Sequence, residues 1–226
     1  MNLKKINLAI YSLFLTNWYG FKLKGIKAPR EKKQLRIRYA QQLMAKLDLT
    51  VEVKNPEKIP TQGQYLVLAN HRGIIDPVVV ELALAETELF GLWVAKKELY
   101  NSPFFGLFVR NAGAILLDRE QSQMRGFFSE IKSAVKEGNS ILIFPEGTRN
   151  KSEKSLLDFK EGFRIIALKN RLPILPIYIE THSDKALDNA LNDKRHQIIS
   201  IVIGDLIDYK EKANIEGLYK TMFSIE

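Results

Sequence analysis

Short apolar runs alternate with longer amphipathic stretches from residue 49 onward. The apolar runs predict strands and the amphipathic stretches predict helices, which is the usual pattern of an α/β domain. The runs are continuously apolar, as in strands that are buried on both faces. The expected fold class is therefore α/β, a single domain with a mostly parallel or mixed sheet flanked by helices. The expected strands are residues 65–69, 92–95, 114–117, 141–144, 174–179 and 198–203, and the expected helices are residues 77–85, 121–136 and 161–170.

An amphipathic pair of helices is expected before this domain. Residues 6–21 form a mostly apolar run of 16 residues, and residues 30–47 carry leucines and a tyrosine at a spacing of four. As a helix the first run reaches roughly 24 Å at about 1.5 Å per residue, less than the roughly 30 Å of a bilayer's hydrocarbon core. It is therefore expected to lie in a membrane surface. We expect residues 1–48 to be a membrane-binding segment and residues 49–226 to be the α/β domain.

The excess of positive charge is confined to the same segment. Residues 1–48 hold eleven Lys and Arg against two acidic residues, which leaves 23 basic and 24 acidic residues in the rest of the chain. Lysines on both sides of an apolar run suit anionic headgroups, and Trp and Tyr suit the membrane interface. The expected partner is a surface of anionic membrane lipids, with the protein bound peripherally. The candidate membrane-binding residues are Lys4, Lys5, Leu13, Phe14, Trp18, Tyr19, Lys22 and Lys24.

The N-terminal segment is open to three other interpretations. Both helices would also fit a pair that packs on the domain with its charges in solvent. A signal peptide shares the basic start and apolar stretch, but no small-x-small cleavage site follows and the next flank is again basic. Nucleic acid is another partner that a positively charged segment would suit. Because no ribonucleoprotein motif, helix-turn-helix pattern or Cys/His finger accompanies the charge, no nucleic-acid partner is expected.

The residue counts exclude several kinds of chemistry. The chain has no Cys, which excludes disulfides, a thiolate nucleophile and Cys-ligated metals. It has three His and no His-Glu-x-x-His pattern. We therefore expect no metal site.

A histidine and an aspartate lie five residues apart after the first expected strand. On one continuous helix this spacing would separate the side chains of His71 and Asp76 by roughly 140°. We therefore expect His71 in the loop, Asp76 as the helix N-cap and Pro77 at the first helical position. Gly73 lets the loop fold back, so that the carboxylate reaches an imidazole nitrogen and orients His71 as a general base. The alternative is a capping Asp beside a histidine bonded to a loop carbonyl.

Polar residues also follow two later strands. Residues 144–149 emerge where a strand ends, the edge at which open α/β sheets bind ligands. Arg149 is suited to bidentate binding of phosphate and Glu146 to holding that guanidinium, although the two would equally form a structural ion pair. Arg119 ends another strand, and two such arginines favour an anion site. The candidate substrate-binding residues are Arg119, Glu146, Gly147, Thr148 and Arg149.

These segments together resemble a known family. They are similar, in order and spacing, to the four blocks of the glycerolipid acyltransferase family, in particular its bacterial 1-acylglycerol-3-phosphate acyltransferases. One departure is Gly73, which stands where many members have Ser and so removes any hydrogen bond made by that hydroxyl. The blocks are Asn70-His71 with Asp76, residues 113–119, residues 144–149 and residues 172–177, and residues 159–162 resemble the segment between the last two.

The resemblance implies an O-acyltransferase at the cytoplasmic face of the cell membrane. His71 and Asp76 would be the catalytic pair, and the 2-hydroxyl of lysophosphatidic acid (1-acylglycerol 3-phosphate) would attack the thioester of acyl-carrier protein or acyl-coenzyme A. No cofactor and no covalent acyl-enzyme are expected. Other acceptors stay open, namely glycerol 3-phosphate, another lysophospholipid or lyso-ornithine lipid. A noncatalytic membrane-surface binding module is the remaining alternative.

Overall fold

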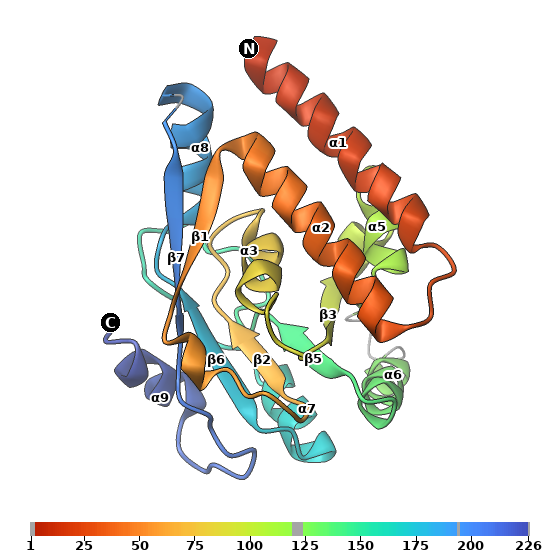
Figure 1. The fold of residues 1–226 in the computed structure, drawn as a ribbon. Coiled ribbons are helices and arrows are strands. Elements are labelled where there is room, and N and C mark those ends of the chain that lie inside the picture. Colours follow the sequence, from red (N-terminus) through yellow and green to blue (C-terminus); the bar gives the residue numbers. More distant parts are fainter. Residues whose placement is uncertain (1–2, 119–123, 194, 226) are drawn as a thin grey trace.

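A computed structural model describes residues 3–118, 124–193 and 195–225. Strands and helices alternate along most of this length (Figure 1). The strands are β1 Leu49–Lys54, β2 Leu66–Ala69, β3 Gly91–Lys96, β4 Ile115–Leu117, β5 Ser140–Ile143, β6 Ile174–Ile179 and β7 Gln197–Ile203. The helices are α1 Leu3–Leu23, α2 Pro29–Leu47, α3 Asp76–Ala83, α4 Lys97–Tyr100, α5 Gly106–Asn111, α6 Met124–Lys136, α7 Gly162–Asn170, α8 Ser183–Asp193 and α9 Ile215–Met222, with a 3-10 turn η1 at Pro56–Lys58.

The strands form one mixed sheet in the order β1-β7-β6-β2-β5-β3-β4. The pairing of β6 with β7 is antiparallel, and the other pairings are parallel. This confirms the expected α/β class with helices on the sheet. In particular, β2 lies between β5 and β6 and runs parallel to both.

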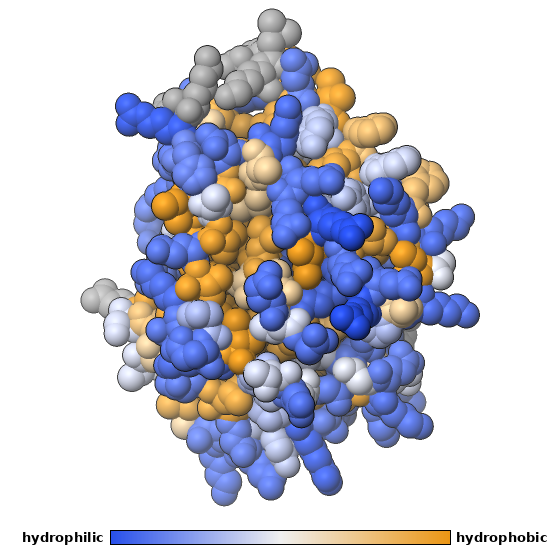
Figure 2. Space-filling model, viewed as in Figure 1, coloured by the Kyte–Doolittle hydropathy of each residue, from blue (hydrophilic) through white to orange (hydrophobic). Residues whose placement is uncertain are grey.

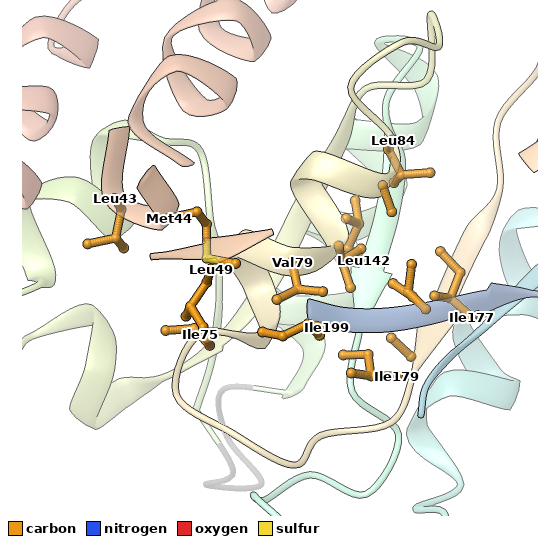
Figure 3. Close-up of a cluster of buried hydrophobic side chains, with 14 of the residues drawn as sticks. Leu43, Met44, Leu49, Ile75, Val79, Leu84, Leu142, Ile177, Ile179 and Ile199 are labelled. Carbon is orange, nitrogen blue, oxygen red and sulfur yellow. The ribbon is translucent and has the colours of Figure 1, made fainter. Parts of the chain in front are cut away.

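Helices cover both faces of the sheet. Because successive side chains of a strand point to opposite faces, the side chains of β2 enter two different cores in turn. Val67 and Ala69 join the core under α1, α2, α3 and α8, whereas Leu66 and Leu68 join the core under α6, α7 and α9. Figure 3 shows part of the first core, in which Val79 of α3 lies beside sheet residues. Burial on both faces is thus confirmed for β2 and also for β6.

The expected elements differ from the observed ones mainly near the edges of the sheet. The bounds of β6 agree with the expected strand 174–179, and those of β2, β3, β4, β5 and β7 agree within one residue. The expectation of two buried faces is wrong for β7, whose Ile198 is 53% exposed, because one face of β7 joins the first core whereas its other face joins neither core. The sequence patterns missed β1, which alternates in burial as edge strands do, and also α4, α5, α8 and α9.

The first two helices form a hairpin against the domain (Figure 1). Leu15 and Tyr19 of α1 are buried, and the Tyr19 ring lies 5.7 Å from that of Tyr39 on α2. The assignment of Tyr19 to the membrane-binding surface is therefore wrong, because this side chain is only 3% exposed and packs against α2. None of the helices among the described residues is both long and apolar enough to cross a membrane.

The opposite side of α1 presents large apolar side chains to solvent. Figure 2 shows apolar surface along this helix, interspersed with hydrophilic side chains. Lys22, which is exposed, places its Nζ 5.0 Å from the centre of the Trp18 ring. Lys24 is exposed, Lys5 and Leu13 are half-buried, and Lys4 belongs to the helix but its side chain lies outside the described part. The large exposed apolar residues of α1, named here the α1 stripe, are Ile10, Phe14, Trp18 and Phe21.

Candidate active site

The candidate site is built at the carboxyl ends of three neighbouring strands. His71 follows β2, residues 144–149 follow β5, and Ser183 follows β6 as the first residue of α8. Because β5 and β6 lie on either side of β2 and run parallel to it, their carboxyl ends meet at one edge of the sheet. The order of the strands therefore brings together segments that are far apart in the sequence.

The expected contact between His71 and Asp76 is present. His71 Nδ1 lies 2.8 Å from Asp76 Oδ2, and the same oxygen accepts hydrogen bonds from the backbone N–H groups of Arg72 at 2.6 Å and Gly73 at 2.7 Å. The expectation that Asp76 is the N-cap is wrong: Ile75 occupies that position and Asp76 begins α3. Its carboxylate turns back to the preceding loop instead of capping its own helix, because the donors of that loop converge on it.

Aromatic stacking restrains one face of the His71 imidazole ring. The Phe144 ring lies parallel to the His71 ring, with centroids 4.0 Å apart and planes at 11°. The Trp93 ring continues the stack, 4.9 Å from Phe144. The His71 side chain keeps 18% of its surface exposed. The imidazole is therefore held on one face and at one nitrogen while it remains reachable from solvent.

The backbone N–H and carbonyl of His71 both form hydrogen bonds with the segment that follows β5. Its N–H donates to Glu146 Oε1 at 2.6 Å, and its carbonyl accepts from the Asn150 N–H at 2.7 Å. Glu146 Oε2 accepts from the Leu157 N–H at 2.9 Å. Glu146 therefore organises loops, and the expectation that it holds the guanidinium of Arg149 is corrected.

Glu146 has an unusual electrostatic setting, because it is only 1% exposed. Burial raises the pKa of Glu146 to about 7, since removal from water disfavours the charged form. The N–H bonds from His71 and Leu157 act in the opposite direction, because they favour the carboxylate. Glu146 thus titrates in the neutral range at the centre of the site.

The remaining phosphate candidates lie in the same turn or outside the described residues. Gly147 has φ of +67°, a conformation that favours glycine, and Thr148 is exposed. Arg149 is 38% exposed, and its Nη1 lies 3.9 Å from Asp184 Oδ2 near the start of α8. Arg119 falls in the part of the chain that is not described. Over residues 3–118, 124–193 and 195–225, no three His, Cys, Asp or Glu side chains are grouped as a metal site requires.

Sequence reasoning missed several residues of this site. Ser183, which is fully buried, donates its hydroxyl to Asp76 Oδ1, and no local pattern marks a contact between residues 107 positions apart. Asn150 follows the arginine of the 144–149 segment directly, so its position was a usable signal. Asn70 is fully buried and bonds both the N–H and the carbonyl of Ile179, which ties the loop after β2 to the end of β6.

Comparison with known proteins places the chain in a family. The family model described as Acyltransferase matches residues 50–180, more than half of the chain. The chain belongs to this Acyltransferase family, as the sequence blocks indicated.

Named relatives are similar to more than half of the chain. The 1-acyl-sn-glycerol-3-phosphate acyltransferase of Helicobacter pylori is 37% identical over 130 residues, which are 55% of this chain and 53% of the relative. That of Escherichia coli is 32% identical over 147 residues, 64% of this chain and 58% of the relative. The chain thus spans little more than half the length of these curated relatives.

A solved structure extends the similarity to the whole fold. The 1-acyl-sn-glycerophosphate (LPA) acyltransferase PlsC of Thermotoga maritima matches with a TM-score of 0.70 at 22% identity. The match covers 98% of this chain and 94% of that one. The N-terminal helices and the mixed sheet therefore belong to one shared fold.

Proposed function

We propose that the chain transfers a fatty acyl group from acyl-carrier protein or acyl-coenzyme A to the 2-hydroxyl of 1-acylglycerol 3-phosphate, which gives phosphatidic acid. The observation that carries the proposal is the 2.8 Å contact between His71 Nδ1 and Asp76 Oδ2, at a sheet edge that also presents Arg149. The names of the relatives from Helicobacter pylori and Escherichia coli support the choice of acceptor.

The geometry supports a separate role for each nitrogen of His71. The carboxylate of Asp76 only accepts, so Nδ1 donates and Nε2 carries the lone pair. Nε2 takes the proton of the 2-hydroxyl as that oxygen attacks the thioester carbon. The new C–O bond forms, the C–S bond breaks, and the imidazolium returns its proton to the departing thiolate. The reaction needs no cofactor besides the acyl donor.

The phosphate of the acceptor is assigned to Arg149 and Arg119, with Gly147 and Thr148 shaping the turn beneath it. The contact of Arg149 with Asp184 supports this role, because a half-exposed pair at 3.9 Å is weak and a phosphate dianion competes with it. Binding the phosphate places the 2-hydroxyl relative to His71, and such positioning supplies much of the rate.

The first 48 residues are proposed to bind the protein peripherally to the cytoplasmic face of the cell membrane. The α1 stripe supplies the apolar contact, and the exposed Lys22 and Lys24 supply charge for anionic headgroups. Phe104 and Phe105, 56% and 38% exposed, extend the stripe, because Asn17 of α1 donates to the Phe104 carbonyl at 3.1 Å. The acceptor lipid would thus reach the site from the bilayer.

The test is acyl transfer by the full chain on vesicles that contain lysophosphatidate, with acyl-coenzyme A and acyl-carrier protein offered separately. Glycerol 3-phosphate, a lysophospholipid with a different headgroup and lyso-ornithine lipid serve as competing acceptors. We expect phosphatidic acid from lysophosphatidate, and loss of nearly all turnover in His71→Ala with a native circular-dichroism spectrum. Substantial activity in His71→Ala would remove the general-base role. Vesicle binding without transfer to any acceptor would make the chain a binding module.

A further inference from the structure

The carboxylate of Asp76 is fully buried and is held by donors from two distant segments. Oδ2 receives His71 Nδ1 and the N–H groups of Arg72 and Gly73, all from the loop that precedes it. Oδ1 receives the hydroxyl of Ser183, 107 residues later in the chain. Among the described residues, Ser183 is the one donor recorded for Oδ1. The local loop therefore fixes one oxygen of the carboxylate, and α8 fixes the other.

Gly73 makes room for this hydroxyl. A Cβ at position 73 would lie 2.7 Å from Asp184 Oδ1 and 2.8 Å from Asp184 N, and closer still to Ser183 Oγ. Gly73 does not have a positive φ, so its backbone does not require glycine. The requirement comes from packing: a side chain at position 73 and the hydroxyl of Ser183 compete for one space.

From this geometry we propose that Ser183 is a positioning residue for acyl transfer, which holds Asp76 in the orientation that serves His71. The inference rests on the proposed function. It also accounts for Gly73, since the hydroxyl that reaches the carboxylate from α8 leaves no room for a side chain at position 73.

Burial separates this role from a direct part in the reaction. Ser183 is 0% exposed, so its hydroxyl does not reach a substrate. Its proton points to a carboxylate oxygen, which is the arrangement of a donor and not of an activated nucleophile. Without the hydroxyl, Oδ1 would be a buried charged acceptor with no donor, and the carboxylate would reorient or take up a proton. Either change loosens the hydrogen bond that orients the imidazole.

Ser183→Ala tests the proposal, because it removes the hydroxyl with little change of volume. We expect kcat to fall about 10- to 100-fold, as for loss of a charge-assisted hydrogen bond at 1.36 kcal/mol per factor of ten. The KM for lysophosphatidate should change less than about 2-fold. In the proton NMR spectrum, the downfield signal of His71 Nδ1–H, assigned by its absence from His71→Ala, should broaden or move.

Ser140→Ala is the matched control, because Ser140 is 1% exposed and its hydroxyl accepts from the Tyr65 N–H at 3.0 Å, away from Asp76. We expect this variant to lose stability but to keep kcat and the downfield signal. A Ser183→Ala enzyme with kcat within about 2-fold of the parent and an unmoved signal would overturn the proposal. So would equal losses of kcat in both serine variants. Absence of acyl transfer by the parent protein to any acceptor would instead show that the proposed function itself is wrong.

Discussion

Phe144 lies flat against the ring of His71, with centroids 4.0 Å apart and planes at 11°. The two residues come from the ends of neighbouring strands, β2 and β5, and are brought together by the parallel pairing of those strands. Asp76 restrains one ring nitrogen and Phe144 restrains one ring face. The imidazole therefore has little freedom to rotate away from the geometry that proton transfer needs.

Removing this aromatic contact should slow the chemical step. We expect Phe144→Leu to lower kcat about 2- to 10-fold, because a stacked pair contributes about 0.5–1.5 kcal/mol beyond its buried area. The KM for lysophosphatidate should stay nearly constant. Steady-state kinetics decide this, with Phe163→Leu in the core on the other face as the control for lost aromatic volume. Equal losses of kcat in both variants would mean that Phe144 acts through stability alone.

Glu146 should make stability depend on pH. Its folded pKa of about 7 lies above the ordinary value of 4.5. Between these values the folded chain holds a proton that the unfolded chain has lost, so the contribution of Glu146 is complete below pH 4.5 and is lost as the pH rises through 7. The unfolding free energy of the parent should fall by about 3 kcal/mol relative to Glu146→Gln between about pH 4 and pH 8, since each pKa unit corresponds to about 1.36 kcal/mol.

Urea unfolding of both proteins from about pH 4 to pH 8 measures the effect. In Glu146→Gln the side-chain NH₂ group replaces one oxygen and faces a backbone N–H donor, which lowers the stability of this variant at every pH. The informative quantity is therefore how the difference in stability between the two proteins changes with pH. A difference that stays constant over the range would contradict the raised pKa.

Arg149 should distinguish acceptors with a phosphate from those without one. We expect Arg149→Ala to raise the KM for lysophosphatidate at least about 10-fold, since an arginine–phosphate contact is lost, and to leave a phosphate-free lysolipid nearly unaffected. Asp184→Asn is the matched variant: it removes the competing charge but keeps an acceptor for the Ile74 N–H. Its KM for lysophosphatidate should fall about 2- to 5-fold. Similar losses on both kinds of acceptor in Arg149→Ala would count against phosphate binding.

The α1 stripe should determine membrane affinity without affecting folding. Phe14 and Trp18 are 69% and 50% exposed, so replacing each with Ser removes little buried contact. We expect each replacement to weaken binding to anionic vesicles about 10-fold or more, because burial of such a side chain contributes about 1.5–3 kcal/mol. Vesicle sedimentation measures this, with Leu168→Ser on α7 as the control, an apolar side chain 47% exposed. Unchanged sedimentation of the Phe14 and Trp18 variants would mean that residues outside the α1 stripe make the membrane contact.

Much of the sheet was predictable because its signal is local. A strand buried on both faces must be apolar at consecutive positions, and β6 was placed at its observed bounds on that basis. The contact of His71 with Asp76 was also predictable, since five residues of loop limit where the carboxylate lies. The N-cap residue of α3 was not predictable. Whether the Asp76 carboxylate caps α3 or binds the preceding loop depends on which N–H groups converge on it.

The sequence alone determined strands β2 to β7, the helical pair, the segment of positive charge and the residue types that meet at the site. Only the tertiary structure decided which face of α1 is buried: Phe14 is more apolar than Tyr19, yet Tyr19 is the buried residue because α2 packs against its side of the helix. It also decided that Glu146 binds the His71 backbone and that Ser183 binds Asp76, across 75 and 107 residues. Such partners depend on which strands lie side by side, and that order follows from the packing of the whole chain.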